Sequence, residues 1–371
     1  MVNKERLVQE FLELVQVDSE TKYEEEISAL LKEKFQSLGL EVYEDGAKEK
    51  TGHGSGNLIC TLKGNKEGTP IYFTSHMDTV TPGNGVKPSI QDGYVVTDGT
   101  TILGADDKAG LSVMFEAIRV LQEQNIAHGT IQFIITVGEE SGLVGAKQLE
   151  KERIIAQYGF ALDSDGKVGE IVVAAPTQAK MKVEIFGKTA HAGVEPEKGI
   201  SSITVAAKAI SKMPLGRIDS ETTANIGRFE GGRATNIVCD YVEILAEARS
   251  ICEEKMNVQV ETMTTLFQET AKKYGANAKI ETEVMYPGFS FGEGDEVVEV
   301  AKRAAKAIGR SSKLVISGGG SDANIIAGYG IPTVNLAIGY EKIHTVEEKM
   351  PIEELTKAAE MVIAIIKEAA K

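Results

Sequence analysis

Short apolar runs that stop abruptly at charged residues are the feature of this sequence that most restricts its fold. Runs suited to β-strands occupy residues 58–62, 71–75, 131–137 and 160–163, and an amphipathic helix lies between the second and the third. Because these runs contain few polar interruptions, both faces of the sheet that they form must be covered. Apolar strands that alternate with helices predict an α/β fold with a largely buried sheet.

Residues 178–289 follow a different pattern. Polar and apolar side chains alternate from Lys180 to Ile185, as expected for a sheet with one face exposed to water. The predicted order of elements, strand-helix-strand-strand-helix-strand, resembles a split ferredoxin-like unit. A chain of 371 residues also exceeds the size of one ordinary compact core. We therefore predict an α+β domain at 178–289, inserted into an α/β domain made of residues 1–177 and 290–371.

The charge balance excludes some classes of partner. The sequence carries 55 acidic against 40 basic residues, a formal net charge of −15. Recognition of nucleic acids or anionic membranes needs a positive surface, so we expect neither partner. No apolar run approaches the roughly 18 residues that span a bilayer, and the N-terminus lacks the apolar core of a signal peptide. Three cysteines without a regular spacing are typical of reduced thiols, so we expect a cytoplasmic protein.

Histidine and carboxylate side chains gather where the apolar runs end. His76 and Asp78 follow the run 71–75, and their spacing places them on one side of an extended chain. This pair could be a metal ligand with its orienting partner, or it could simply close the strand end. Asp106 and Asp107 begin the next helix, where acidic residues also stabilise backbone amides and the helix dipole without any metal. Taken singly, the two motifs leave both interpretations open.

The pair Glu139 and Glu140 is harder to explain without a cation. Two adjacent negative charges at the end of a buried strand are costly unless a positive group compensates them. Asp163 ends another apolar strand, and His344 lies far downstream in Gly-Tyr-Glu-Lys-Ile-His-Thr. Histidine and carboxylate ligands without thiolates suit zinc, cobalt or manganese, and a shared carboxylate can hold two ions about 3.5–4 Å apart. Spacing alone does not decide which glutamate binds a metal and which transfers a proton.

With these motifs in this order, the sequence resembles the dizinc exopeptidase and deacylase superfamily, in particular its peptidase T-like members. The superfamily includes peptidase T, carboxypeptidase G, aminoacylase and succinyl-diaminopimelate desuccinylase. The motifs that carry the resemblance are Ser75-His76-Met77-Asp78, Gly104-Ala105-Asp106-Asp107-Lys108 and Gly138-Glu139-Glu140. The likeness covers almost the whole chain. It implies a zinc-exopeptidase-like catalytic domain, an inserted lid or dimerisation domain, and two divalent ions per chain, with zinc first and cobalt or manganese as alternatives.

The resemblance also implies a role for each residue of the cluster. The implied metal ligands are His76 and Asp163 for the first ion, Glu140 and His344 for the second, and Asp106 as the bridge between them. Asp78 would orient His76. Asp107, the neighbour of the bridging Asp106, would bind no metal. Glu139 would be the general base that takes a proton from the bridging water and passes it to the leaving amine.

Further residues resemble the substrate contacts of the superfamily: His191, Asn236, Arg249, Gly319 and Gly320. His191 resembles a lid histidine that stabilises the tetrahedral oxyanion, although an exposed loop histidine would look the same. Arg249 resembles a substrate-binding arginine, but it could equally be a surface or interface residue. The glycine-rich loop at 317–322 lacks the lysine of a P-loop, which argues against nucleotide binding. Peptidase T has an arginine just before its paired glycines, where Gly318 stands here, so the selection of peptide length stays open.

The predicted function is metal-dependent hydrolysis of an amide bond in small peptides by a tripeptidase-like aminopeptidase, through a metal-bridging hydroxide. An N-acyl amino acid deacylase, or another non-peptide amidohydrolase, would use the same machinery with a different pocket. A protein that only binds metal or peptide is a third interpretation, but such a role would not require Glu139. We expect a small peptide or N-acyl amino acid as substrate. We also expect a homodimer through the inserted domain, with His191 acting in its own or the neighbouring subunit's site.

Overall fold

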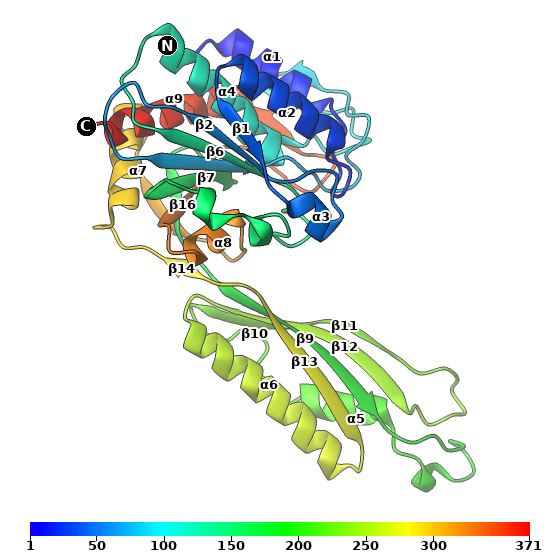
Figure 1. The fold of residues 1–371 in the computed structure, drawn as a ribbon. Coiled ribbons are helices and arrows are strands. Elements are labelled where there is room, and N and C mark those ends of the chain that lie inside the picture. Colours follow the sequence, from blue (N-terminus) through cyan, green and yellow to red (C-terminus); the bar gives the residue numbers. More distant parts are fainter. The chain divides into compact units, whose positions relative to one another are not determined.

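The computed structural model describes residues 1–371, which divide into two compact units (Figure 1). The first unit consists of Met1–Ala174, Phe291–Ser317 and Ser321–Lys371. The second consists of Ala175–Ser290 together with Gly318–Gly320. The second unit therefore interrupts the chain of the first and includes one short loop from further along the sequence.

A mixed sheet forms the centre of the first unit. Its strands lie in the order β1 (Glu41–Glu44), β2 (Leu58–Leu62), β6 (Ile131–Thr136), β3 (Ile71–His76), β7 (Tyr158–Ser164), β16 (Thr333–Ala337) and β8 (Glu170–Ala175), with β15 (Lys313–Ile316) beside β8. β3 runs parallel to both β6 and β7. Every residue of β3 and β6 is buried, in agreement with their uninterrupted apolar character. The carboxyl ends of these three strands therefore meet at one edge of the sheet.

Helices pack on this sheet with their apolar faces. The long ones are α1 (Lys4–Val15), α2 (Glu25–Ser37), α4 (Ala105–Glu123), α7 (Glu296–Ala307) and α9 (Ile352–Ala369), and the short ones are α3 (Ala47–Thr51) and α8 (Asp322–Gly328). α4 contacts β3, β7, α1 and α9, so it is the central helix of its layer. In α1, Leu7, Phe11 and Leu14 share one fully buried face, and Asn3 caps the first turn by accepting the N–H of Arg6.

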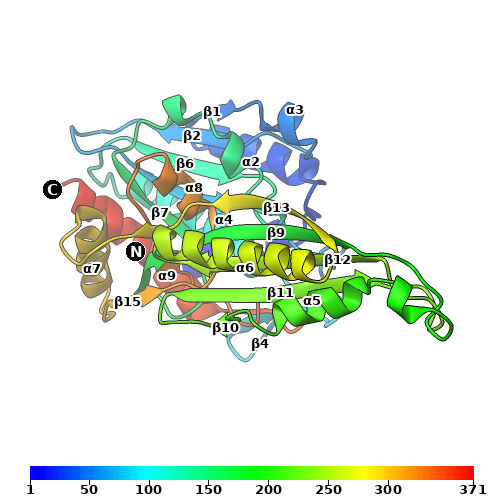
Figure 2. The same ribbon diagram turned by 90° about the horizontal axis from the view of Figure 1, so that it is seen from below.

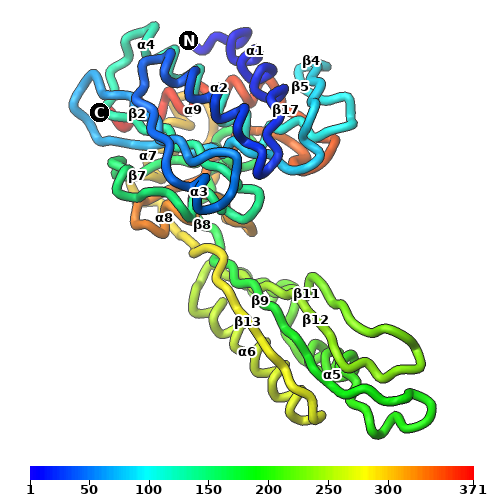
Figure 3. Tube along the Cα trace, turned by 45° about the vertical axis from the view of Figure 1, so that its right-hand side comes forward, coloured from blue at the N-terminus to red at the C-terminus, as the bar shows by residue number.

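A second, three-stranded sheet also belongs to the first unit (Figure 3). Its antiparallel strands lie in the order β17 (Lys349–Pro351), β5 (Tyr94–Val96) and β4 (Ser89–Gln91). β17 follows the loop that carries His344 and directly precedes α9. The sequence patterns did not predict this sheet, because a strand of three residues is too short for a recognisable alternation.

The second unit is an antiparallel sheet with two helices on one face (Figure 2). Its strands lie in the order β10 (Gly216–Arg217), β11 (Thr222–Gly231), β12 (Tyr241–Ser250), β9 (Thr177–Phe186) and β13 (Asn277–Tyr286), and its helices are α5 (Ser202–Ile210) and α6 (Glu253–Lys273). Met181, Val183 and Ile185 alternate along β9 and are buried in one cluster with residues of both helices. The predicted fold class, α/β with an inserted ferredoxin-like α+β unit, is confirmed.

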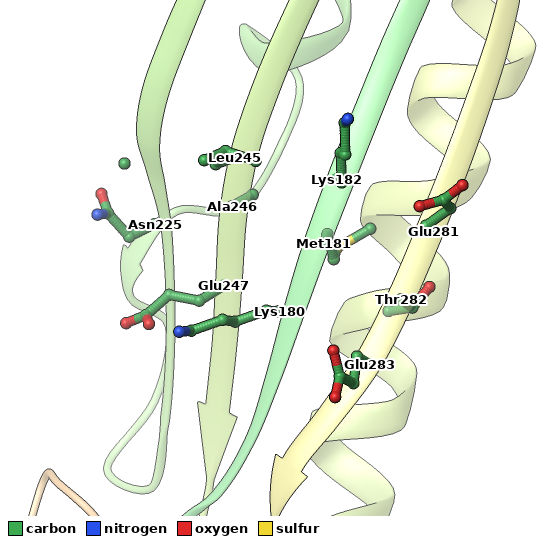
Figure 4. A pocket seen from close by; sticks show the side chains of 11 residues that line it. Lys180, Met181, Lys182, Asn225, Leu245, Ala246, Glu247, Glu281, Thr282 and Glu283 are labelled. Atoms are coloured by element: carbon green, nitrogen blue, oxygen red, sulfur yellow. The ribbon is translucent and has the colours of Figure 1, made fainter. Parts of the chain in front are cut away.

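The opposite face of this second sheet is charged (Figure 4). The register places Lys180 between Glu247 of β12 and Glu283 of β13, and the Lys182 ammonium lies 3.1 Å from the carboxylate of Glu243. Opposite charges on neighbouring strands stabilise such a face without an apolar covering.

The remaining elements are short. They are the strand β14 (Phe289–Ser290) and 3-10 turns at Ala146–Gln148, Lys151–Arg153 and Pro196–Lys198. The chain contains no helix whose length and apolarity would suffice to cross a membrane.

Candidate metal centre

Three neighbouring parallel strands bring four of the predicted acidic and histidine residues to one edge of the central sheet. His76 is the last residue of β3, Glu139 and Glu140 follow β6, and Asp163 lies near the end of β7. Because β3 lies between β6 and β7, these side chains converge. The chain turns directly after β6 at Gly138, whose φ of 59° favours glycine.

Asp106 faces the two predicted histidine ligands with different oxygens. Its Oδ1 lies 3.0 Å from Nε2 of His76, and its Oδ2 lies 3.3 Å from Nε2 of His344. Oε1 of Glu140 lies 2.9 Å from that same His344 nitrogen, and Oδ1 of Asp163 lies 3.9 Å from Nε2 of His76. Ligand atoms of His76, Asp106 and Glu140 all lie within 4.8 Å of one another. The five side chains therefore form two groups that share Asp106.

The histidines and carboxylates of this cluster compensate one another's charge. Burial raises the pKa of Asp106, but hydrogen bonds with His344 and His76 outweigh burial and hold the pKa below its usual range. Hydrogen bonds with Asp106 and Glu140 raise the pKa of His344 to about 10. Burial lowers the pKa of His76, but its bonds with carboxylates, Asp106 first, raise the pKa well above the usual value. Two protonated imidazoles therefore supply the positive charge that a metal cation would otherwise supply.

Asp78 holds both the histidine and the turn that carries the glutamates. Nδ1 of His76 donates to the backbone carbonyl of Asp78 at 2.9 Å, which directs Nε2 into the ligand cluster. The buried carboxylate of Asp78 accepts the backbone N–H groups of Glu139 at 3.0 Å and Glu140 at 3.3 Å, and the hydroxyl of Thr21. Sequence spacing suggested only the first of these contacts.

Tyr340 holds the remaining carboxylate of the cluster. Its phenol donates to Oδ1 of Asp163 at 3.2 Å, and the backbone N–H of Asp163 donates to the side chain of Asn335 at 3.0 Å. Burial raises the pKa of Asp163 well above its usual value, and the charge of Asp106 raises it further. Tyr340 was not predicted, because a tyrosine beside an apolar strand looks like an ordinary core residue.

Asp107 and Glu139 have different surroundings. Oδ1 of Asp107 accepts the N–H of Gly110 at 3.2 Å within α4, so this side chain is engaged by its own helix. The carboxylate of Glu139 makes no hydrogen bond or ion pair with another side chain. Burial raises its pKa well above the usual value, and the charge of His76 partly opposes the shift.

The predicted substrate contacts of the second unit fall into two separate groups. His191 and Asn236 are both exposed and lie together, since the N–H of Ala192 donates to the carbonyl of Asn236 at 2.9 Å. Arg249 lies near the other end of β12, where its Nη1 donates to the carbonyl of Gly318 at 3.1 Å. Arg249 thus contacts Gly318, the position at which the resemblance to peptidase T would lead us to expect an arginine.

A carboxylate accompanies Arg249. Its Nε and Nη2 donate to the two oxygens of Glu247 at 2.9 and 3.1 Å, a bidentate arrangement. Nε2 of Gln178 donates to the same carboxylate at 2.6 Å. The sequence motifs indicated Arg249 but not this partner, although Glu247 lies two residues earlier on the same strand and therefore on the same face of the sheet.

The three glycines of the loop differ in the space around them. No atom lies within 4 Å of a Cβ built on Gly318, so this position can accept a side chain. A Cβ on Gly320 would approach the ring of Tyr286 to 2.4 Å, so that glycine is required for packing. Gly319 lies between them and belongs to the same loop, which is part of the second unit.

Residues 72–368 match the model of a protein family described as peptidase family M20/M25/M40. The chain belongs to this family. The crystal structure of aminopeptidase PepT from Bacillus cereus ATCC 10987 is 71% identical, covers 100% of both chains and has a TM-score of 0.97. That of a tripeptidase from Staphylococcus aureus subsp. aureus Mu50 is 52% identical, covers 100% of this chain and 99% of the other, and has a TM-score of 0.98. Protein YqjE of Bacillus subtilis (strain 168) is 71% identical over 371 residues, the full length of both chains.

Membership in the M20 family confirms the resemblance to peptidase T-like proteins and the prediction of a metallopeptidase enzyme. In this M20 chain the candidate metal ligands are His76, Asp106 and Glu140, which the sequence motifs had indicated. The motifs did not indicate Glu348, which is 2% exposed and accepts the N–H of Asp106 at 3.1 Å. Nothing in the sequence distinguishes it from its exposed neighbour Glu347.

Metal binding should release protons from this centre. Because the pKa of His344 is raised to about 10 and that of His76 is also raised, both imidazoles carry a proton at neutral pH, which a metal ion must displace. We expect about one proton to leave per ion bound, and the affinity to fall as the pH falls. Calorimetric titration of metal-free protein with Zn2+ in buffers of different ionisation enthalpy measures this number. Release of no protons would show that the histidines are neutral before binding.

Proposed function

We propose that this M20 chain is a metal-dependent aminopeptidase that hydrolyses small peptides at a centre of two divalent ions. The observation that carries the proposal is the position of Asp106, whose two carboxylate oxygens face His76 and His344 separately. A carboxylate so placed can hold two ions at once. The similar structures of an aminopeptidase and a tripeptidase support the same class of substrate. Imidazole and carboxylate ligands favour zinc, with cobalt or manganese as alternatives.

The donor set fits two such ions. The proposed ligands are His76 and Asp163 for one ion, His344 and Glu140 for the other, and Asp106 for both. Buried and half-buried carboxylates at this density need positive charge beside them, and bound ions would supply it once the two imidazoles have lost their protons. Bound ions would polarise the scissile carbonyl and lower the pKa of a water molecule between them.

Glu139 is the proposed general base and acid. The carboxylate of Asp78 accepts the backbone N–H of Glu139 at 3.0 Å, whereas the side-chain carboxylate of Glu139 is free. A pKa raised by burial suits a group that must accept a proton and give it back. The carboxylate takes a proton from the attacking water and passes it to the nitrogen of the leaving amine. His191 would donate a hydrogen bond to the carbonyl oxygen as negative charge develops there, and Asn236 would contact the substrate beside it.

Replacing each glutamate by glutamine should separate their roles. Glu139→Gln should retain two ions per chain and lose about 100- to 10,000-fold in kcat, because an amide cannot carry the proton. Glu140→Gln should instead lose one ion. Elemental analysis and turnover of tripeptides measure both effects, with N-acyl amino acids as comparison substrates. Near-normal turnover by Glu139→Gln would show that the base is wrongly assigned, and cleavage of N-acyl amino acids alone would indicate a deacylase.

His191 with Asn236 and Arg249 with Gly318 lie too far apart in one chain to contact the same small peptide. β12 spans about 27 Å from Tyr241 to Arg249 at about 3.4 Å per residue. Tyr241 pairs with Phe186, and His191 follows beyond that end of β9. A tripeptide is only about 10 Å long. We therefore propose a homodimer in which each chain lends His191 to the site of its neighbour.

The domain roles follow from this arrangement. Residues 1–177 and 290–371 form the proposed catalytic domain, and residues 178–289 form the proposed lid and dimerisation domain. Cysteines 60, 239 and 252 form no disulfide, which fits the reducing cytoplasm as the location of this enzyme.

Mixing two inactive variants tests the exchange of His191. His191→Ala and Glu139→Gln should each be nearly inactive alone. After subunit exchange, a mixed dimer should contain one intact site, which combines Glu139 of one chain with His191 of the other. Recovery of kcat in the mixture, with each variant alone as control, supports the homodimer. If the mixture stays inactive although mixed dimers are shown to form, His191 acts within its own chain.

Arg249 and the glycines 319 and 320 are proposed to hold the far end of the peptide. The charge of Arg249 is offset by Glu247, so the pair together offers a terminal carboxylate little net attraction. Gly318 adds no charge. We infer that this subsite tolerates a neutral group.

Amidation of a substrate's C-terminus should therefore have a small effect. We expect kcat/KM for one tripeptide and its amide to agree within about tenfold, or about 1.4 kcal/mol. Gly318→Arg, for which there is space, and Glu247→Gln, which leaves the charge of Arg249 unopposed, should both increase the preference for the free acid. A loss beyond about a hundredfold on amidation of the wild-type substrate would contradict the tolerant subsite. Arg249→Ala should then remove the discrimination.

A further inference from the structure

Glu348 joins two segments that carry proposed metal ligands. It is buried and lies in the turn between His344 and β17. Its Oε2 accepts the N–H groups of Leu103 and Gly104, each at 2.8 Å, and its Oε1 accepts the N–H of Asp106 at 3.1 Å. One carboxylate thus satisfies three backbone donors at the start of α4.

The start of α4 cannot satisfy these donors by itself. Its N-cap position is Gly104, with φ 73°, which has no side chain to accept a hydrogen bond. Asp106 (φ −83°, ψ 101°) and Asp107 (φ −122°, ψ 33°) have non-helical backbone angles, so the turn is irregular. Buried N–H groups are costly without an acceptor. The turn that presents Asp106 therefore depends on an acceptor from a distant part of the chain.

The same residue holds the loop of His344. The backbone N–H of Glu348 donates to the carbonyl of Thr345 at 3.0 Å, and Lys349, the next residue, begins β17, which pairs with β5. His344 has φ 61°, a left-handed conformation that a residue other than glycine keeps only where its surroundings determine it. Nε2 of His344 lies 3.3 Å from Oδ2 of Asp106, so the two segments held by Glu348 meet at these side chains.

We propose that Glu348 is a positioning residue that sets the separation of Asp106 and His344, and thereby the affinity for the metal ion that these two side chains share. The inference rests on the proposed dinuclear centre. Glu348 is not one of the proposed ligands, and it would act through the backbone of Asp106 and the loop of His344. The ion at His76 and Asp163 should depend less on Glu348, since those ligands come from the ends of β3 and β7.

Titration of metal-free protein with Co2+ tests this role, with visible absorption and calorimetry following each binding step. Glu348→Gln retains the shape of the side chain but turns an amide N–H toward the three backbone donors. We expect the affinity of one Co2+ step to fall about 10- to 100-fold, as for other residues that orient metal ligands, and the affinity of the other step to fall less. Glu348→Asp keeps the carboxylate and should recover part of the loss. Excess Co2+ should restore kcat of Glu348→Gln for a tripeptide.

Asp45 provides the matched control. It is buried, precedes α3, and accepts the N–H groups of Ala47 at 3.0 Å and Asn57 at 2.9 Å, as well as the side-chain amide of Asn57 at 2.8 Å. Asp45→Asn places the same amide against three donors at a helix that carries no proposed ligand. Both Asp45→Asn and Glu348→Gln should lower Tm, because each leaves buried N–H groups without an acceptor, but Asp45→Asn should leave both Co2+ affinities unchanged.

Unchanged Co2+ affinities in Glu348→Gln, or equal losses in it and in Asp45→Asn, would overturn the proposal, because Glu348 would then serve stability alone. If circular dichroism shows that Glu348→Gln does not fold, Glu348→Asp decides by the same criterion. Binding of fewer than two Co2+ ions by the wild-type protein would instead contradict the dinuclear centre. Glu348 would then still be judged by the affinity of the ion that binds.

Discussion

Carboxylates crowded at the edge of a buried sheet are the constraint on which the rest of the first unit depends. Asp106, Glu140 and Asp163 converge where β3, β6 and β7 end, and a carboxylate in such surroundings is costly without a compensating charge. His76 and His344 supply that charge through contacts of about 3 Å with Asp106. A helix start that merely used Asp106 to stabilise its own amides would need neither histidine. The presence of both favours a cation site over the ordinary structural role of an aspartate at that position.

Remote carboxylates hold the segments that carry the ligands. Asp78 accepts two N–H groups of the Glu139–Glu140 turn, and Glu348 accepts three at the turn of Asp106. These turns are irregular, so helix and strand hydrogen bonds cannot satisfy their backbone donors, and buried side chains do so instead. The geometry of the centre is therefore a property of contacts between distant segments, which explains why its supporting residues are as buried as the hydrophobic core.

Pairs of opposite charges also determine the chemical character of the open sheet face in the second unit. Glu247 holds Arg249 bidentately, and Lys180 lies in register between two glutamates on the open face of the sheet (Figure 4). An arginine that is free of such a partner would select strongly for a substrate carboxylate, whereas the paired one offers a planar set of donors with little net charge. The proposed tolerance for a neutral terminal group therefore rests on Glu247 as much as on the absence of an arginine at position 318.

The sequence by itself determined the fold class and the members of the candidate metal cluster. Uninterrupted apolar runs predict a largely buried sheet, and alternation from Lys180 onward predicts a sheet with one face exposed to water. Both patterns are local properties of the chain. Paired acids at the ends of such runs likewise indicate a cation, because the cost of burying charge does not depend on the details of packing.

Only the tertiary structure decided which atoms meet. That Asp106 faces one histidine with each oxygen, and that Glu348 rather than Glu347 is buried beneath it, both depend on contacts between residues far apart in the chain. Local periodicity carries no information about such pairings, because hydrogen bonds and ion pairs act over about 3–4 Å and their partners are brought together only when the whole sheet and its loops have folded.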